Sequence, residues 1–241
     1  MIINREKKYL FIQIPHTAST ALGKELCLNY GGEPILRKHS LYHEFLRSDI
    51  PHKDQYFVFA TVRNPLDDVV GRYFKFKTNH GEIFTTPQYS SKNGGFVSQK
   101  RLKQYAFIQE KEASFAEFFK KHYRLTYDNW VSMVRADCDF IIRFETLQAD
   151  FSKVLALIGL AQKRPLPVSN KTAKQDADPS TYYTPEIRQQ ACEIFGPFME
   201  KWHYEFPSHW ESTYPWTRKV EFELLGQMRK FYRKFLNKRY L

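Results

Sequence analysis

The sequence contains little cysteine and no long apolar run. Its three cysteines, Cys27, Cys138 and Cys192, are odd in number and far apart in 241 residues, which argues against a disulfide framework and against a zinc cluster. No apolar run approaches the roughly 20 residues that cross a bilayer, and residues 1–8 lack the apolar core of a signal peptide. We therefore expect buried thiols and a cytoplasmic location.

Acidic residues are outnumbered as well. The chain has 26 acidic and 37 basic residues, which gives a formal net charge of +11. This balance favours anionic partners such as nucleotides, acidic glycans, nucleic acid or an acidic membrane face. The zinc-finger, RRM and helix-turn-helix patterns that read nucleic acid are absent from the sequence, so we expect no nucleic-acid partner.

Glycine is missing from the loop of the first candidate site. Residues 9–14 form an apolar run of strand-forming residues, Pro15 closes it, and a helix-compatible segment follows the loop. Without glycines this loop is not a Walker A motif. A strand, a tight loop and a helix start still direct unpaired N–H groups and the positive end of the helix dipole to one point. The hydroxyls of Thr17, Ser19 and Thr20 join them, so the loop is predicted to cradle an anion.

A second strand, turn and helix follow. Residues 56–62 are continuously apolar, as in a central parallel strand, and we expect them to run beside the first strand. Arg63 comes directly after this strand, where open α/β sheets bind ligands, and its guanidinium suits two-point contact with a phosphate. The alternative is an ion pair of Arg63 with Asp67 or Asp68 on a helix that begins at Pro65. Its position favours the ligand role.

The rest of the chain continues the alternation of strands and helices. Residues 138–144 predict a third strand and a helix follows to about residue 160, which supports a parallel sheet with right-handed crossovers. Turn residues and mixed charges over 79–112 predict a mobile loop on the substrate side. Ser114 and Glu117 predict a capping box that opens an aromatic-rich helix of the core.

Residues 217–241 predict a terminal amphipathic helix. Apolar residues recur at helical spacing from Val220 to Phe235, and the other face is basic. One interpretation is a helix docked on its own domain with a solvated charged face, and the other is a contact with a membrane surface or a polyanion. We expect a main domain over 1–210 and this appended segment over 211–241.

Several of these stretches together resemble the sulfotransferase family. They are FIQIPHTASTAL, ATVRNPLDDVVGRYF, IIRFETLQADF, LPVSNKT and YYTPEIRQQACEIFGPFMEKWHYEFP, in family order from about residue 8 to 207. The resemblance, closest to the carbohydrate sulfotransferase branch and its bacterial relatives, implies a three-layer P-loop-like α/β fold with a central parallel sheet flanked by helices. It also implies transfer of a sulfuryl group from 3'-phosphoadenosine 5'-phosphosulfate (PAPS) to a hydroxyl of a glycan or other polar acceptor, without a metal.

Carried over by position, the resemblance assigns the donor site. Arg63 would contact the 3'-phosphate, and Gly71 stands where family members have a serine for the same phosphate. His16 stands where the family has a lysine that stabilises the leaving oxygen, a role that an imidazolium can also fill. Family members usually have Gly, Ser and Arg at the positions of Ser19, Ala21 and Asp68. The residues that would hold the 5'-phosphosulfate, chiefly through backbone N–H groups, are Thr17, Ala18, Ser19, Thr20 and Ala21.

The resemblance also points to an acceptor side. Related carbohydrate enzymes often place an acceptor-facing histidine at the position of His39, which makes it the expected general base, with His43 and Glu44 as nearby alternatives. Asn170 and Lys171 lie in a family loop that approaches the substrate, although a purely structural turn is the other interpretation there.

Two other functions remain open. The replacements at positions 16, 21 and 71 suit a catalytically weak or inactive anion- or nucleotide-binding protein on the same fold. A P-loop kinase of small molecules is the second alternative, although the Walker lysine and a carboxylate motif for Mg²⁺ are not recognisable.

Overall fold

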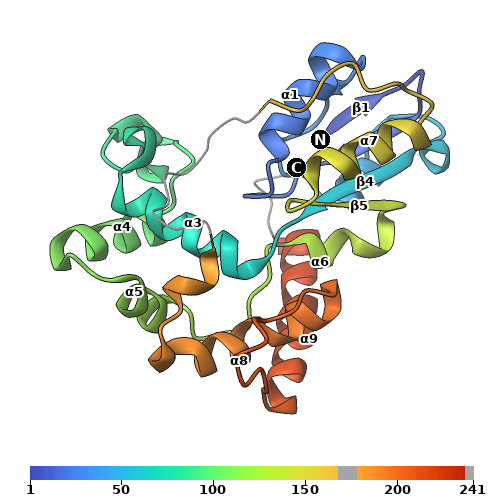
Figure 1. Cartoon of the computed structure of the whole chain (residues 1–241). Coiled ribbons are helices and arrows are strands. Elements are labelled where there is room, and N and C mark those ends of the chain that lie inside the picture. Colours follow the sequence, from blue (N-terminus) through green and yellow to red (C-terminus); the bar gives the residue numbers. More distant parts are fainter. Residues whose placement is uncertain (168–177, 237–241) are drawn as a thin grey trace. The chain divides into compact units, whose positions relative to one another are not determined.

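The computed structural model describes residues 1–167 and 178–236. The chain divides into two compact units, of which the first contains Met1–Asn64, Asp128–Ser169 and Glu223–Leu241 and the second contains Pro65–Tyr127 and Asn170–Phe222. The first unit carries the β-sheet, and the second is built mainly from helices (Figure 1). The division into 1–210 and 211–241 stays a prediction.

A five-stranded sheet of order β3-β1-β2-β4-β5 forms the centre of the first unit. Strand β4 pairs in parallel with β2 and with β5, whereas β1 pairs antiparallel with β2 and with β3. The sheet is therefore parallel from β2 to β5, and β1 and β3 add an antiparallel edge. The strands are β1 (Ile2–Asn4), β2 (Tyr9–Ile12), β3 (Glu33–Pro34), β4 (Phe57–Val62) and β5 (Phe140–Arg143).

The three predicted parallel strands are confirmed. Tyr9 of β2 aligns with Phe57 of β4, and Phe59 of β4 aligns with Phe140 of β5. These strands were predictable because β2 and most of β4 are buried and therefore read as apolar runs. Strands β1 and β3 were not predicted, since they are only 3 and 2 residues long and carry no such pattern.

Helices flank this sheet, which confirms the predicted α/β architecture. Leu22 of α1 and Phe151 of α7 share a buried core with Phe11 of β2 and Phe59 of β4, whose rings stack 5.0 Å apart. Helix α6 packs against β4, and α6 and α7 lie on opposite sides of the strands (Figure 1). The helices of this unit are α1 (Ser19–Asn29), α2 (Tyr42–Leu46), α6 (Val131–Val134) and α7 (Leu147–Leu157), with 3-10 helices η1 (Lys53–Gln55) and η5 (Arg135–Asp137).

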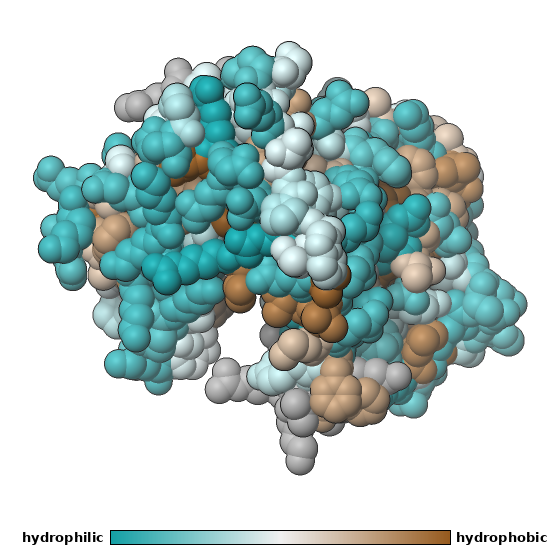
Figure 2. All heavy atoms as spheres, turned by 90° about the horizontal axis from the view of Figure 1, so that it is seen from below, coloured by the Kyte–Doolittle hydropathy of each residue, from teal (hydrophilic) through white to brown (hydrophobic). Residues whose placement is uncertain are grey.

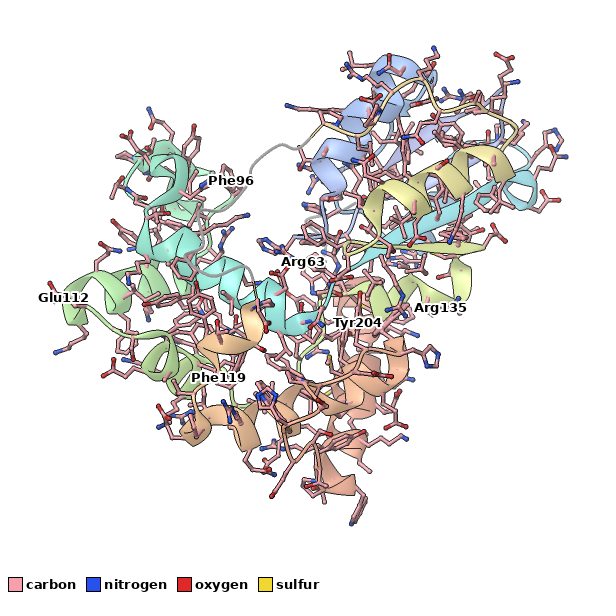
Figure 3. The ribbon with its side chains drawn as sticks, in the orientation of Figure 1. Arg63, Phe96, Glu112, Phe119, Arg135 and Tyr204 are labelled. Carbon is pink, nitrogen blue, oxygen red and sulfur yellow. The ribbon has the colours of Figure 1, made fainter. Side chains whose placement is uncertain are left out.

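Aromatic side chains form the core of the second unit. Phe119 of α5 is labelled in Figure 3. Its ring contacts the rings of Tyr123, Tyr183 and Phe195. The aromatic side chains of the helix that follows Ser114 therefore belong to the core, as predicted. The helices of this unit are α3 (Pro65–Lys77), α4 (Gln99–Lys111), α5 (Phe115–His122) and α8 (Pro185–Trp202), with 3-10 helices η2 (His80–Glu82), η3 (Pro87–Tyr89), η4 (Ser91–Asn93) and η6 (Pro179–Tyr182).

The predicted capping box of α5 is confirmed. Ser114 N donates to Glu117 Oε2 at 2.8 Å, and Glu117 N donates to Ser114 Oγ at 3.3 Å. By contrast, the prediction of a loop throughout 79–112 is wrong, because α4 occupies its second half and short 3-10 helices occupy part of the first. Helix α4 buries only Ile108, so its sequence shows no apolar face that would reveal it. The prediction that residues 79–112 lie on the substrate side stays a prediction.

The C-terminal segment is helical, as predicted, with α9 (Trp216–Phe231) continuing into the π-helical η7 (Tyr232–Leu236). Its apolar face is largely exposed: Trp216, Leu224 and Met228 are 74%, 61% and 65% exposed. Hydrophobic side chains form separate patches on a mostly hydrophilic face in Figure 2. Within the described ranges, no helix combines the length and apolarity that crossing a bilayer requires.

The basic side chains of α9, in contrast, contact acidic groups. Arg218 pairs with Glu193 at 3.1 Å, Lys219 pairs with Glu200 at 2.6 Å, and Arg229 lies 3.5 Å from Asp128. The apolar face is thus less packed than the first interpretation expects, with only Phe222 of α9 buried, while the side chains of Lys219 and Glu200 remain 59% and 54% exposed. Sequence patterning alone missed these pairs because acidic partners far along the chain cannot be read from the helix itself.

Candidate functional site

The loop between β2 and α1 contains two residues with left-handed backbone. The φ angles of His16 and Ala18 are 66° and 60°, and the carbonyl of Ala18, the N-cap residue, accepts a hydrogen bond from Ala21 N at 3.0 Å. The N–H groups of Ser19 and Thr20 open the helix and have no intrahelical acceptor. The first turn carries no acidic side chain that would neutralise the helix dipole. The loop geometry therefore suits an anion.

Contacts inside the unit fix the shape of this loop. Thr17 is fully buried, its Oγ1 donates to Ile14 O at 2.9 Å, and it contacts the hydroxyl of Thr61 on β4. Gln13 Nε2 donates to Ser19 O at 3.0 Å. The Thr17 hydroxyl consequently ties the loop to the sheet and does not face a ligand. Of the three predicted hydroxyls, the half-buried one of Thr20 is the most accessible.

Arg63 directly follows the last residue of β4 (Figure 3). Its side chain contacts the anion loop. Its Nη1 donates to His16 O at 3.1 Å, and its guanidinium carbon lies 4.1 Å from the centre of the Phe144 ring. Stacking on a ring fixes the guanidinium plane while its edge remains able to donate hydrogen bonds. The structure thus brings together, within one unit, the predicted anion loop and Arg63, the residue predicted to contact a 3'-phosphate.

His39 contacts the end of the strand that leads into the loop. Its Nδ1 lies 2.8 Å from Gln13 O, and because a carbonyl only accepts, Nδ1 carries a proton and Nε2 is the acceptor of the neutral ring. Burial lowers the pKa of His39, and the charges of Lys38 and Arg233 act in the same direction. Arg233 Nη2 also donates to His39 O at 3.0 Å. The ring is therefore neutral at neutral pH, with Nε2 able to take a proton.

Lys38 also reaches the anion loop, although it was not predicted as a site residue. Its Nζ donates to Thr20 Oγ1 at 2.8 Å. Loss of solvent around the ammonium, followed by the charge of Lys24, lowers the pKa of Lys38. The only signal in the sequence was its position beside His39 in a basic run, which does not show that the side chain reaches the loop.

The two alternatives to His39 are placed differently. Glu44 Oε1 accepts from Leu41 N at 2.9 Å and Oε2 accepts from Ser40 Oγ at 2.8 Å, so this carboxylate caps α2. His43 lines a pocket of about 220 Å³ together with residues on α2, α6, η5 and α9, and neither His39 nor a residue of the anion loop lines it. These contacts favour His39 over both alternatives.

The remaining predicted residues belong to the second unit or lie outside the described residues. Gly71 is buried in α3 of the second unit. In the same helix Asp68 is 1% exposed and accepts from Arg72 Nη2 at 2.6 Å and from Tyr127 Oη at 2.5 Å. Burial, followed by the charge of Asp68, raises the pKa of Tyr127 well above its ordinary value, so the phenol stays protonated and donates. The loop positions 170 and 171 lie outside the described residues.

The three cysteines are free thiols, two of them buried and Cys27 half-buried. Among the described residues, no group of three or more His, Cys, Asp or Glu side chains is arranged to hold a metal ion.

Comparison with known proteins gives the family. A search of the curated proteins finds no match. A family model described as the sulfotransferase family matches residues 1–198, a range that includes the anion loop, Lys38, His39 and Arg63. The match extends over most of the 241 residues. The chain therefore belongs to the sulfotransferase family.

Proposed function

We propose that the protein transfers a sulfuryl group from PAPS to a hydroxyl of a glycan or another polar acceptor. In this proposal the N–H groups at the start of α1 and the Thr20 hydroxyl bind the 5'-phosphosulfate. Arg63 binds the 3'-phosphate through its side chain, and Gly71, which the resemblance assigns to the same phosphate, has no side chain to add a contact. The observation that carries the proposal is the contact of Arg63 with the anion loop, which suits a nucleotide with phosphates at both ends.

The proposed transfer follows from the chemistry of these groups. The bond between sulfur and the bridging phosphate oxygen breaks, and both electrons stay on that oxygen. The acceptor oxygen forms the new bond to sulfur, and its proton passes to Nε2 of His39. Charge accumulates on the leaving oxygen, where positioned donors and cations lower the barrier. His16, at the position of the family lysine, supplies such a cation when its ring is protonated.

Calorimetry tests the donor assignment. The reaction product 3'-phosphoadenosine 5'-phosphate (PAP) should bind more tightly than ATP, and an absence of this preference would contradict the proposal. Arg63→Met should lower the affinity for PAP. It should leave the already weaker affinity for AMP unchanged, because AMP lacks the 3'-phosphate. An equal loss for both nucleotides would mean that Arg63 acts on the loop rather than on the 3'-phosphate.

The two alternative functions give different results in the same assays. An inactive binding protein would bind PAP but release no sulfate from radiolabelled PAPS, with or without an acceptor. A small-molecule kinase would prefer ATP with Mg²⁺ and transfer its γ-phosphate. Polysaccharides and small polyols should be compared as acceptors, since the glycan assignment rests on the resemblance of the sequence alone.

We also propose that α9 contacts a membrane surface. Its exposed apolar side chains favour a lipid interface over a polyanion, because the basic side chains Arg218 and Lys219 already pair with acidic groups. Sedimentation with anionic vesicles tests this. Wild type should sediment and the pair Leu224→Ser and Met228→Ser should not, whereas binding to heparin that survives both substitutions without any vesicle binding would favour a polyanion.

A further inference from the structure

We propose that Lys38 is a catalytic residue that supplies a cation at the anion loop and stabilises the leaving oxygen of PAPS. This inference rests on the proposed function. It assigns to a residue outside the loop the charge that a lysine inside the loop supplies elsewhere in the family. In this chain the loop position itself is occupied by His16.

The geometry comes from one hydrogen bond. Lys38 Nζ lies 2.8 Å from Thr20 Oγ1, and Thr20 is the second residue of α1. An ammonium carries three donors, and the hydroxyl engages one of them. Within the described part of the chain no acidic side chain pairs with Lys38. The remaining donors are thus able to meet an anion bound at the start of the helix.

The segment that carries Lys38 is held in place at its neighbour. His39 contacts Gln13 O through Nδ1, and its own carbonyl accepts a hydrogen bond from Arg233. The backbone beside Lys38 is therefore fixed against both the strand that precedes the loop and the C-terminal helix. Because the neighbouring backbone is fixed, the Lys38 ammonium is held near one position, as a catalytic cation requires.

The charge of Lys38 also lasts over a wider pH range than that of a histidine. An imidazole with an ordinary pKa near ~6.5 is mostly neutral above neutral pH, whereas a lysine keeps its proton well above that value. Although Lys38 is an exposed residue, partial loss of solvent around its ammonium and the charge of Lys24 lower its pKa, which makes the ammonium a stronger hydrogen-bond donor. Lys38 therefore provides the leaving-group cation over a wider pH range than an ordinary imidazole would.

Substitution of Lys38 tests this at about pH 8. Lys38→Met should lower the turnover of radiolabelled PAPS about 100- to 1,000-fold, the range for loss of one donor to a developing charge, while PAP binding weakens far less. Lys24→Met is the matched control, because it removes the same charge from the exposed surface of α1 nearby, and it should leave turnover within a few-fold of wild type. Thermal melting shows whether each variant is folded.

A second substitution makes the test specific. In the Lys38→Met background, His16→Lys should restore most of the lost turnover, because it returns a permanent cation to the loop. Wild-type turnover in folded Lys38→Met, or an equal loss in Lys24→Met, would overturn the assignment.

The outcomes separate this inference from the proposed function. PAP binding with PAPS turnover that Lys38→Met does not change overturns only the role of Lys38. PAP binding without any PAPS turnover by wild type overturns the catalytic role and supports the inactive alternative. No binding of PAP overturns both proposals.

Discussion

Replacement of His39 by asparagine removes the proposed general base while keeping a hydrogen-bond donor near the position of Nδ1. The introduced amide can still donate to the Gln13 carbonyl, which His39 Nδ1 contacts at 2.8 Å, but it offers no basic nitrogen. Loss of a general base should lower kcat about 100- to 10,000-fold, or about 3–5 kcal/mol of barrier. PAP affinity should stay near the wild-type value, because the donor site does not include this ring.

The pH profile gives a sharper readout of the same change. Protonation of the His39 ring removes the base, so wild-type activity should fall as pH decreases through the pKa of His39. Burial lowers this pKa, which places the acid limb below the ordinary ~6.5 of histidine. The assay is initial-rate sulfate transfer from about pH 5 to pH 8, with the pKa of the ring measured independently by NMR.

Two results would refute this reasoning. One is a His39→Asn enzyme that retains the acid limb of wild type, since another group would then titrate. The other is a loss of kcat smaller than about tenfold, which lies below the range for a general base.

Three further predictions concern the supports of the site and the second unit. Arg233→Met removes the hydrogen bond to the carbonyl of the proposed base and should lower kcat by up to about 100-fold without shifting PAP affinity; rates and calorimetry check this, and unchanged kcat would contradict it. Gly23→Ala would place a Cβ 2.7 Å from Gln13 Nε2 and should reduce the free energy of unfolding, measured by urea titration, by about 1–3 kcal/mol. Wild-type stability of this variant would mean that the Gln13 side chain moves aside at little cost. Tyr127→Phe deprives the buried Asp68 of a donor and should cost about 1–3 kcal/mol, and a cost near zero would mean that the carboxylate finds a replacement.

The parallel strands and the anion loop were predictable because each has a local cause. Strands β2 and β4 are buried along nearly their whole length, so their sequences are apolar runs. Pro15 and the small residues of the loop indicate the turn into α1. The Ser114 capping box was readable for the same reason, since both partners lie within four residues of chain. In each case the sequence pattern and the interaction that it reports occupy one short stretch.

The missed features depend on contacts between distant residues. Lys38 reaches Thr20, and Arg233 reaches His39, across stretches that no periodicity connects. Helix α4 buries a single side chain, so the pattern that identifies an amphipathic helix is absent from it. The acidic partners of α9 likewise lie far from it in the chain, which is why its charged face was expected in solvent.

The contact between Arg233 and His39 has a consequence for synthesis of the chain. The two residues are 194 positions apart, so the backbone carbonyl of the proposed base acquires its partner only after residue 233 has left the ribosome. At about 5–20 residues per second, the β2 strand and its loop exist for many seconds before the final helix arrives. The surroundings of the proposed base are therefore completed only after the strands and the anion loop have been synthesised.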